Sequence, residues 1–297
     1  MKLIVEPEAG VGPLLSAIRR ARRSLDIVIF RFDLDELEDE IGAAVKRGVV
    51  VRALIAHTNR GGDKGLRKLE QRMLKRGVTV CRTKDDLVRY HGKLIVVDRR
   101  RAFILGFNYT AADLRSRSFG VVSRSPRLVK ELLRLFESDV NRTDYTPRVR
   151  DLVVSPENAR RRLEAFIRKA RSRLDIYDPQ LTDDRMLELL QRRVEKGVDV
   201  RILGKLEGKW DSGAFDARPY PGKRLHVRAI IRDGRRAFVG SQSLRKLELD
   251  DRREVGVIVR DRAVVRKLQK TFERDWARTE VSAARRKSPE KMLKKAA

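Results

Sequence analysis

The sequence predicts an α/β protein made of two tandem, pseudo-symmetric repeats, each a sheet flanked by helices. Three observations predict this fold. Long segments of the chain recur at a constant spacing, short apolar strands alternate with helical patterns inside each copy, and one histidine motif occurs in each copy. The chain has 297 residues, of which 41% are hydrophobic, so it is long enough to bury the core that two such units require.

The duplication is clearest early in each copy. Residues 17–30, AIRRARRSLDIVIF, match residues 166–179, FIRKARSRLDIYDP, at a separation of 149 residues (166 − 17). The copies also end alike, with FESDVNRT at 136–143 and FERDWART at 272–279. A period of this length indicates a duplicated domain and not a solenoid unit.

Within the first copy, hydrophobic periodicity and the positions of proline and glycine predict six elements. They are a helix at 13–22, a strand at 25–30, a helix at 37–48, a strand at 49–55, a helix at 65–77 and a strand at 78–83. This alternation predicts a largely parallel sheet with helices on its faces.

The second copy replaces the third helix and its strand with a glycine- and proline-rich loop at 204–224, which carries Trp210, Phe215 and Tyr220 among basic residues. Aromatic rings in such a setting suit contact with an anionic membrane surface. We expect repeat 1 at residues 1–148, repeat 2 at 149–279 and a basic, frayed tail at 280–297.

Charge points to an anionic partner. The formal charge is +28, from 70 Lys and Arg against 42 Asp and Glu, so the molecule should attract nucleic acid or anionic lipid. A surface of Arg and Glu pairs, as in thermophiles, is the alternative explanation. The single cysteine, Cys81, excludes an internal disulfide and a cysteine-cluster metal site, and we expect it to fill the core of a short strand.

No uninterrupted apolar run long enough to span a membrane occurs, and residues 1–20 lack the apolar core of a signal peptide. We therefore expect a cytoplasmic protein that contacts a membrane at most peripherally.

The first chemical motif is His91–Thr110, HGKLIVVDRRRAFILGFNYT. On a strand, His91 and Lys93 point to one face because side chains alternate, which sets an imidazole beside a fixed cation. Asp98 falls on the opposite face by the same rule. We expect Asp98 to support the structure and not to react.

The motif returns in the second copy, where His226, Arg228 and Asp233 have the same spacing. Asp233, like its counterpart, is expected to be structural. A purely structural role for the histidines would have to explain both positions at once. The third histidine, His57, has no counterpart in the other copy, and we expect it in a loop or on the surface.

If a pseudo-twofold axis brings the two motifs together, they form a phosphate site. Lys93 and Arg228 neutralise the non-bridging oxygens of a phosphodiester, and Asn108 and Ser243 add hydrogen-bond donors. One histidine attacks phosphorus to give a phosphohistidine, while the other protonates the leaving oxygen and later deprotonates the incoming alcohol or water. This chemistry requires no metal and no other cofactor.

These residues resemble the phospholipase D superfamily, whose signature is HxKxxxxD followed by a Gly-Ser-x-Asn turn, and the resemblance covers nearly the whole chain. It implies two pseudo-symmetric α/β lobes, each with a mixed sheet flanked by helices, around one shared active site. It further implies a phosphohistidine intermediate, with His91 as the nucleophile and His226 as the acid and base. The second motif, with DDRREVGVIV downstream, looks most like bacterial cardiolipin-synthase-type members.

Neither motif is complete. The departures are Leu105 and Gly106 in place of Gly-Ser in repeat 1, and Arg228 and Ser243 in place of lysine and asparagine in repeat 2. Ser241 is kept and is expected to contact the phosphate. Arginine binds phosphate bidentately, but its longer planar fork shifts the phosphorus relative to the histidines, so slow or altered turnover stays open.

Glu254 stands where the superfamily keeps a carboxylate that orients a catalytic histidine, and the resemblance places it across the twofold axis on His91. The corresponding place in repeat 1 holds Ser118 and Phe119, which carry no carboxylate. His226 is therefore expected to be less constrained. A surface charge at a strand edge is the alternative for Glu254.

Three functions stay open. The first is a phosphodiesterase or phosphatidyltransferase acting on phospholipids, the second a nuclease of the same superfamily, and the third a catalytically degenerate binder of anionic lipid or nucleic acid. The low aromatic content, 6%, argues mildly against stacking of single-stranded bases. No obligate protein partner is expected, because both motifs lie in one chain.

Overall fold

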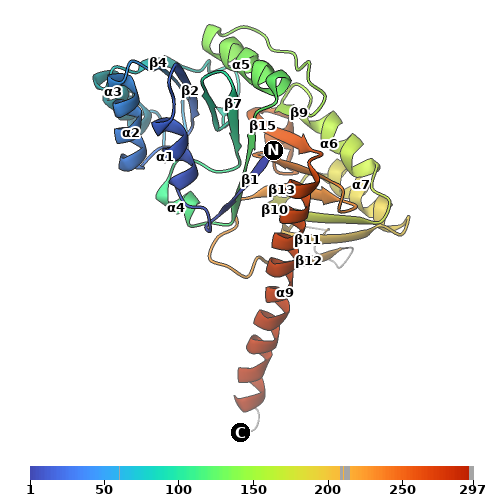
Figure 1. Ribbon diagram of the computed structural model, residues 1–297. Coiled ribbons are helices and arrows are strands. Elements are labelled where there is room, and N and C mark those ends of the chain that lie inside the picture. Colours follow the sequence, from blue (N-terminus) through green and yellow to red (C-terminus); the bar gives the residue numbers. More distant parts are fainter. Residues whose placement is uncertain (60, 208–209, 211–214, 294–297) are drawn as a thin grey trace.

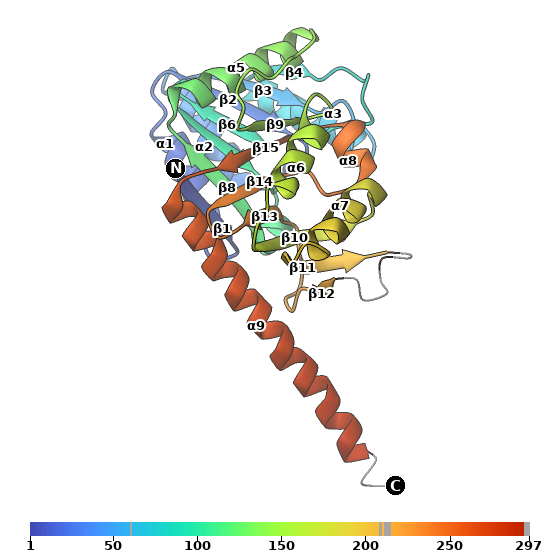
Figure 2. The same ribbon diagram turned by 90° about the vertical axis from the view of Figure 1, so that its right-hand side faces the viewer.

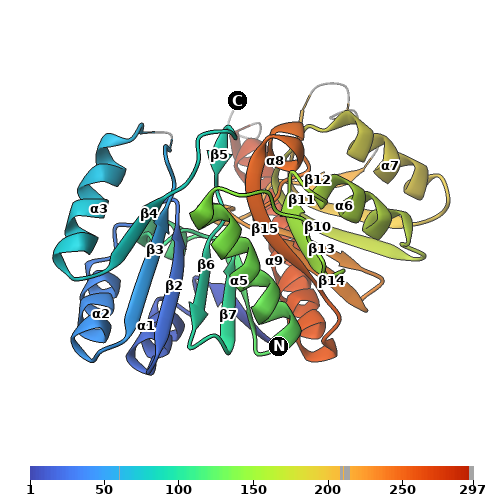
Figure 3. The same cartoon turned by 90° about the horizontal axis from the view of Figure 1, so that it is seen from above.

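The computed structural model describes residues 1–59, 61–207, 210 and 215–293, which form two sheets with helices on their outer sides (Figure 1). Figure 3 shows α1, α2 and α3 outside the first sheet and α6 and α7 outside the second. The inner faces of both sheets, together with α5 and α9, enclose one hydrophobic core to which both repeats contribute, with Val96 and Ile104 from repeat 1 and Ala229 and Val239 from repeat 2 among its residues. The repeats are therefore halves of one body.

Repeat 1 contains every element predicted for it. In order it comprises β1 (Lys2–Glu6), α1 (Gly12–Arg19), β2 (Ser24–Ile29), α2 (Asp35–Lys46), β3 (Val50–Ile55), α3 (Lys64–Lys75), β4 (Thr79–Arg82), β5 (Arg89–Tyr90), β6 (Leu94–Val97), β7 (Arg101–Leu105), α4 (Ala111–Leu114), β8 (Ser118–Ser123) and α5 (Pro126–Asn141). Helix α3 illustrates the pattern, because it buries Leu66, Leu69 and Met73 on one face and ends before Gly77, which has a positive φ of 80°.

Repeat 2 follows a similar order. Its described residues include no helix equivalent to α3, but they do include a strand equivalent to β4, which the sequence had assigned to the loop. It comprises β9 (Leu152–Ser155), α6 (Ala159–Arg168), β10 (Arg173–Leu181), α7 (Asp184–Val194), β11 (Asp199–Leu206), β12 (Asp216–Arg218), β13 (Arg228–Arg232), β14 (Arg236–Gly240), α8 (Lys246–Asp250), β15 (Arg252–Val259) and α9 (Arg262–Leu293). The frayed tail predicted from residue 280 is helical instead as far as Leu293, since α9 continues without a break and projects from the body (Figure 2).

The expectation of a largely parallel sheet is wrong. In the first sheet, with strand order β1-β8-β7-β6-β2-β3-β4, only β2, β3 and β4 pair in parallel. The β6–β7 pair is antiparallel because the short turn at 98–100 reverses the chain beside itself, and the β2–β6, β7–β8 and β1–β8 pairs are antiparallel as well. The sheet is thus mixed, as the superfamily resemblance implied.

The second sheet ties the two halves together. Its order is β12-β11-β10-β13-β14-β15-β5, with β9 also paired to β15. Strand β5 belongs to repeat 1, and its pairing with β15 of repeat 2 sets the chain just before His91 against the chain that carries Glu254. This pairing positions the two residues across the repeat boundary.

Each repeat contains the same ion-pair cluster, in which one arginine joins two carboxylates at 2.6–2.8 Å. The clusters are Asp26–Arg52–Glu137 in repeat 1 and Asp175–Arg201–Glu273 in repeat 2. The glutamates are those of the matching FESD and FERD segments, so the recurrence at the end of each copy has a structural cause.

Two further arginines cross between the repeats. Arg117 of repeat 1 pairs with Asp275 of repeat 2 at 2.8 Å, and Arg253 of repeat 2 pairs with Asp139 of repeat 1 at 3.1 Å. Since all four side chains are buried, each pair satisfies charges that would otherwise be costly to enclose. The reciprocal pairs mark the pseudo-twofold relation between the halves.

The loop aromatics do not form an exposed membrane-facing group. Trp210 and Phe215 are 7% and 8% exposed and pack in the core beneath the second sheet, where the Trp210 indole donates to Asp184 at 2.7 Å. Tyr220 is half-buried. Residues 208–209 and 211–214 of this loop lie outside the described residues.

Two smaller expectations concern Cys81 and membrane spans. Cys81 lies on β4 but is only half-buried, because β4 is the edge strand of the first sheet. Of the helices described, none combines the length and the hydropathy of a membrane span.

Candidate active site

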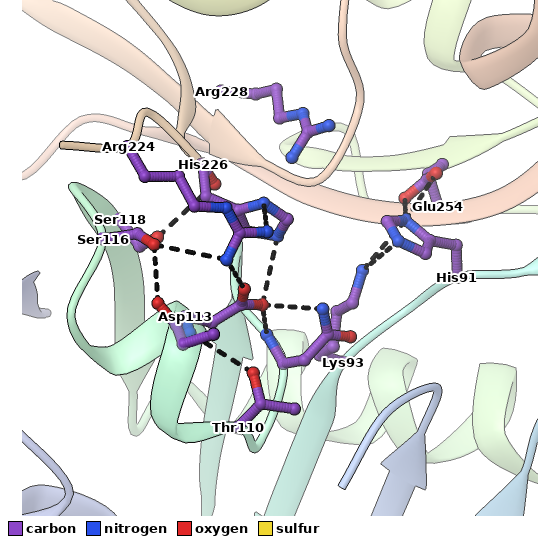
Figure 4. Close-up of polar contacts among 12 residues, drawn as sticks. His91, Lys93, Thr110, Asp113, Ser116, Ser118, Arg224, His226, Arg228 and Glu254 are labelled. Atoms are coloured by element: carbon purple, nitrogen blue, oxygen red, sulfur yellow. Dashed lines mark hydrogen bonds and ion pairs between the residues drawn. The ribbon is translucent and has the colours of Figure 1, made fainter. Parts of the chain in front are cut away.

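The two motif histidines lie just before equivalent strands. His91 and Lys93 occupy the segment between β5 and β6, and His226 immediately precedes β13. Both are therefore outside the strands on which the sequence placed them. Figure 4 shows their side chains converging from the two repeats, with Lys93 and Asp113 in the same group.

The motif aspartates lie at the far ends of these strands, where their carboxylates bind backbone N–H groups. Asp98 accepts hydrogen bonds from the backbone N–H groups of 22–24 at 2.7–3.1 Å, and Asp233 accepts from those of 171–173 at 2.8–3.1 Å. Both residues have a positive φ, 52° and 53°, which aspartate tolerates better than most side chains. They fix the turns after β6 and β13.

His91 is buried, with 8% of its surface exposed, and its Nδ1 lies 2.8 Å from Glu254 Oε1 and 2.9 Å from Oε2. The Phe30 ring meets the imidazole edge-on at a centroid distance of 4.4 Å. Burial first, then repulsion from Lys93 and Arg228, lowers the pKa of His91 well below its usual range. His91 is therefore neutral near pH 7, and an Nδ1–H donated to Glu254 leaves Nε2 as the acceptor, which the Nζ of Lys93 contacts at 2.9 Å.

Lys93 is 1% exposed and its Nζ lies 2.9 Å from each ring nitrogen of His91. Burial lowers the pKa of Lys93 to about 7, with Arg228 acting in the same direction and Glu254 opposing it. A buried ammonium in this position is stabilised by any anion that enters the site, because the anion replaces the lost hydration.

Glu254 has no exposed surface and belongs to repeat 2, so it reaches His91 across the repeat boundary. Burial raises the pKa of Glu254, while Lys93 and a hydrogen bond from Ser241 oppose that rise. The Ser241 hydroxyl has one proton to donate, and the Val255 carbonyl oxygen, 3.3 Å away, is its alternative acceptor. Ser241, expected to contact phosphate, is instead fully buried behind Glu254 and supports it.

His226 has a carboxylate neighbour that the sequence did not reveal. Its Nε2 lies 3.2 Å from Asp113 Oδ2, and its Nδ1 lies 3.3 Å from Arg224, which can only donate. Burial first, then Arg228, lowers the pKa of His226 well below its usual range, whereas Asp113 acts to raise it. Burial alone would raise the pKa of Asp113, but His226 and the donors on Asn108 lower it overall.

A signal for Asp113 was present in the repeat. Glu248 follows it by 135 residues (248 − 113), and the same separation relates His91 to His226. The two acids also do the same local task, since the backbone N–H of Asn108 donates to Asp113 at 2.8 Å and that of Ser243 donates to Glu248 at 2.7 Å.

Arg228 contributes a cation with spare hydrogen-bonding capacity. Its Nε donates to Ser243 Oγ at 3.0 Å, and its NH2 lies 3.9 Å from Glu248. Its NH1 is buried and makes no hydrogen bond among the described residues. A buried unpaired guanidinium N–H is costly, so an anion that accepts from it is stabilised. Ser243, expected to bind phosphate, here orients the arginine.

The structure also accounts for Asn108 and Gly106 of repeat 1. The Asn108 side chain donates its amide N–H to Asp113 at 2.7 Å, so it too braces the acid beside His226. At Gly106 a Cβ would lie 3.0 Å from the carbonyl oxygens of Gly240 and Phe119, so no side chain fits without moving backbone. The departure from Gly-Ser at this position follows from the close approach of the two halves.

The remaining candidates lie elsewhere. His57 is exposed at the end of β3 and makes no side-chain contact with the residues above. Among the residues described, no three His, Cys, Asp or Glu side chains are close enough together to hold a metal ion.

Comparison with known proteins gives a family match over most of the chain. The family model for "Cardiolipin synthase, PLD-like domain" matches residues 14–140 and 163–276, one segment in each repeat. A mitochondrial cardiolipin hydrolase of Danio rerio is 31% identical over 139 residues, covering 44% of this chain and 59% of that protein. The minor cardiolipin synthase ClsB of Bacillus subtilis is 25% identical over 229 residues, covering 65% of this chain and 57% of that protein.

The chain thus spans somewhat more than half the length of these two relatives. Among solved structures, a polyphosphate kinase from Porphyromonas gingivalis superposes with a TM-score of 0.75 at 18% identity, over 92% of this chain and 49% of that one. This likeness concerns the fold alone.

Proposed function

The chain belongs to the cardiolipin synthase-type family of phospholipase D-like domains, and on this premise we propose that it cleaves or transfers the phosphodiester of a phospholipid through a phosphohistidine on His91. The observation that carries the proposal is the buried His91–Glu254 contact beside Lys93. It provides a neutral imidazole whose Nε2 accepts from Lys93 until a phosphate oxygen takes over that cation, and the cation stands where phosphate charge must be neutralised.

The reaction proceeds in two balanced steps. His91 Nε2 attacks phosphorus and forms the N–P bond while the bond from phosphorus to the leaving alkoxide breaks. His226 gives that oxygen a proton from Nε2, which makes no hydrogen bond among the described residues. A water or alcohol then attacks phosphorus, His226 takes its proton, and the N–P bond breaks. Hydrolysis or transfer depends only on which oxygen nucleophile enters.

Substrate binding itself prepares His226 for the first step. In the free site, burial and Arg228 hold its pKa low. A bound phosphodiester anion offsets the charges of Arg228 and Lys93, which removes repulsion and lets His226 accept a proton as an ion pair with Asp113. The acid is thus formed when the substrate is present.

The lipid class is supported by the relatives, whose names are those of a cardiolipin synthase and a cardiolipin hydrolase. The test is an assay with chelator present on vesicles of phosphatidylglycerol or cardiolipin, comparing wild type with His91→Ala. Removal of the nucleophile should lower turnover by at least about a thousandfold. The control is His57→Ala, which changes the exposed third histidine and should leave turnover unchanged.

Two results would redirect the assignment. Cleavage of DNA or RNA that depends on His91, with lipid untouched, would make the chain a nuclease. Binding of anionic vesicles without turnover in wild type would make it a degenerate binder. Loss of activity on chelation would contradict the metal-independent mechanism.

A further inference from the structure

Each repeat carries a cationic cavity that the phosphodiesterase mechanism does not use. In repeat 2 it measures about 1240 Å³ and is lined mainly by three segments, 168–171, 232–236 and 260–266. We call it the arginine cavity. Its counterpart in repeat 1, of about 790 Å³, surrounds the turn after β6 and is lined by Arg22 and Arg101 among others.

The arginine cavity lies at the opposite end of the strand from the histidine. His226 precedes β13 and Asp233 follows it, and only Asp233 lines the cavity. Five residues of strand separate the two ends, a span of roughly 17 Å. An anion bound in the cavity therefore does not contact His226.

The positive charge of the cavity is largely uncompensated. Its one carboxylate, Asp233, is already hydrogen-bonded to the backbone N–H groups of residues 171–173. In the described part of the chain, Arg168, Arg171 and Arg235 have no carboxylate within ion-pair distance, and all three are exposed. Burial is the main cause that lowers the pKa of Arg232, while Asp233 opposes it and repulsion from Arg236 and Arg260 adds to it. A polyanion would relieve that repulsion.

We propose that the arginine cavity is a binding site for the phosphate backbone of double-stranded nucleic acid, separate from the histidine site. Guanidinium groups bind phosphate oxygens bidentately, and several of them on one concave surface suit a row of phosphates. The residues that line the cavity include no aromatic ring, so stacking of unpaired bases has no platform there. The expected binding is independent of base sequence.

A lipid bilayer fits these observations less well. The side chains lining the cavity include no large apolar group that could insert among acyl chains. A bilayer resting on this end of the sheet would also lie a strand length away from His226, out of reach of the reaction proposed for it. The counterpart cavity has the same relation to His91, because Asp98 follows β6 and His91 precedes it.

The test uses the full chain carrying His91→Ala, so that cleavage cannot disturb binding. A DNA duplex of about 30 base pairs is titrated at salt concentrations from about 50 to 200 mM, over which phosphate contacts weaken steeply. The cavity variant combines Arg168→Glu, Arg171→Glu and Arg235→Glu. Its matched control combines Lys64→Glu, Lys68→Glu and Lys75→Glu, which removes the same charge from exposed positions on α3.

The cavity variant should bind the duplex at least about tenfold more weakly and with a shallower dependence on salt, whereas the control changes little. Equal weakening in both variants would overturn the proposal, since net charge alone would then explain binding. An unchanged duplex affinity with reduced flotation on anionic vesicles would also overturn it, by assigning the cavity to lipid head groups.

Lipid turnover, measured with His91 intact, separates this proposal from the proposed function. The cavity variant should keep wild-type turnover because its three arginines do not touch the histidine site. Failure of duplex binding with normal turnover rejects only the cavity assignment. Absent turnover in wild type with cavity-dependent duplex binding rejects only the phospholipid reaction.

Discussion

The two halves hold their histidines in different ways. His91 of repeat 1 has both oxygens of Glu254 within 2.9 Å of its Nδ1. His226 of repeat 2 has Asp113 at 3.2 Å from its Nε2 and is also touched by the exposed Arg224. Each carboxylate comes from the opposite repeat, so the cross-boundary arrangement is shared while the carboxylate and its geometry are not.

The difference has a local cause. The counterpart of Glu254 in repeat 1 is Ser118 (254 − 136), whose hydroxyl is 3.5 Å from the main-chain oxygen of His226. Instead, the carboxylate beside His226 is that of Asp113, which lies on α4 five residues before Ser118. The imidazole of His91 is therefore firmly oriented, which suits a nucleophile. That of His226 is held more loosely, which suits a group that carries a proton.

The largest expected effect comes from Glu254→Gln. The amide can donate to Nδ1, which would move the ring proton to Nε2 and remove the lone pair that attacks phosphorus in the proposed mechanism. By analogy with other histidines held by a carboxylate, kcat should fall about 10³- to 10⁴-fold. Turnover of a phospholipid by wild type and variant measures this.

The matched control is Ser118→Ala, at the equivalent position, which should change kcat by less than about twofold because Ser118 orients no imidazole. A loss below about tenfold in Glu254→Gln would show that Glu254 does not set the tautomer.

The sequence predicted part of this arrangement. The spacing of the repeats and the superfamily signature gave His91, His226 and the contact from Glu254. The sequence does not reveal Asp113 as the acid, because it lies five residues before the position equivalent to Glu254 and its proximity to His226 depends on how the halves pack. The direction of the strands was misjudged for a related reason, since the short turn at 98–100 sets an antiparallel pair that helix and strand periodicity does not show.

A smaller effect is expected from Asp113→Asn. Asp113 acts to raise the pKa of His226, so its loss disfavours the imidazolium that protonates the leaving alkoxide. Turnover of a natural lipid should fall about 10- to 100-fold. A substrate with a nitrophenolate leaving group needs little protonation and should lose far less.

The ratio between the two substrates distinguishes proton transfer from damage to the fold, because Asp113 also accepts the Asn108 backbone N–H. Equal losses on both substrates would mean that Asp113 matters only for structure. The same pair of substrates applied to Glu254→Gln should show equal losses, since the proposed mechanism requires attack by His91 on both.

The smallest effect concerns the two cations of the site, which are Lys93 in repeat 1 and Arg228 in repeat 2. The pKa of Lys93 is lowered to about 7, so its charged form, which binds phosphate, is lost as the pH rises through that value. The pKa of His91 is lowered, so its neutral form is lost only as the pH falls below the usual range of histidine. The value of kcat/KM should therefore be highest below pH 7, between the two pKa values, and above pH 7 it should decline by about tenfold per pH unit.

Lys93→Arg tests the origin of that alkaline decline. Arginine keeps its charge across this range, so the variant should lose the alkaline limb while its activity at pH 6.5 falls by less than about tenfold from the altered geometry. The profile of kcat/KM against pH in wild type and variant measures both effects. If the alkaline limb persists in Lys93→Arg, the titrating group lies elsewhere, and the two cations of the site would be equivalent despite their different chemistry.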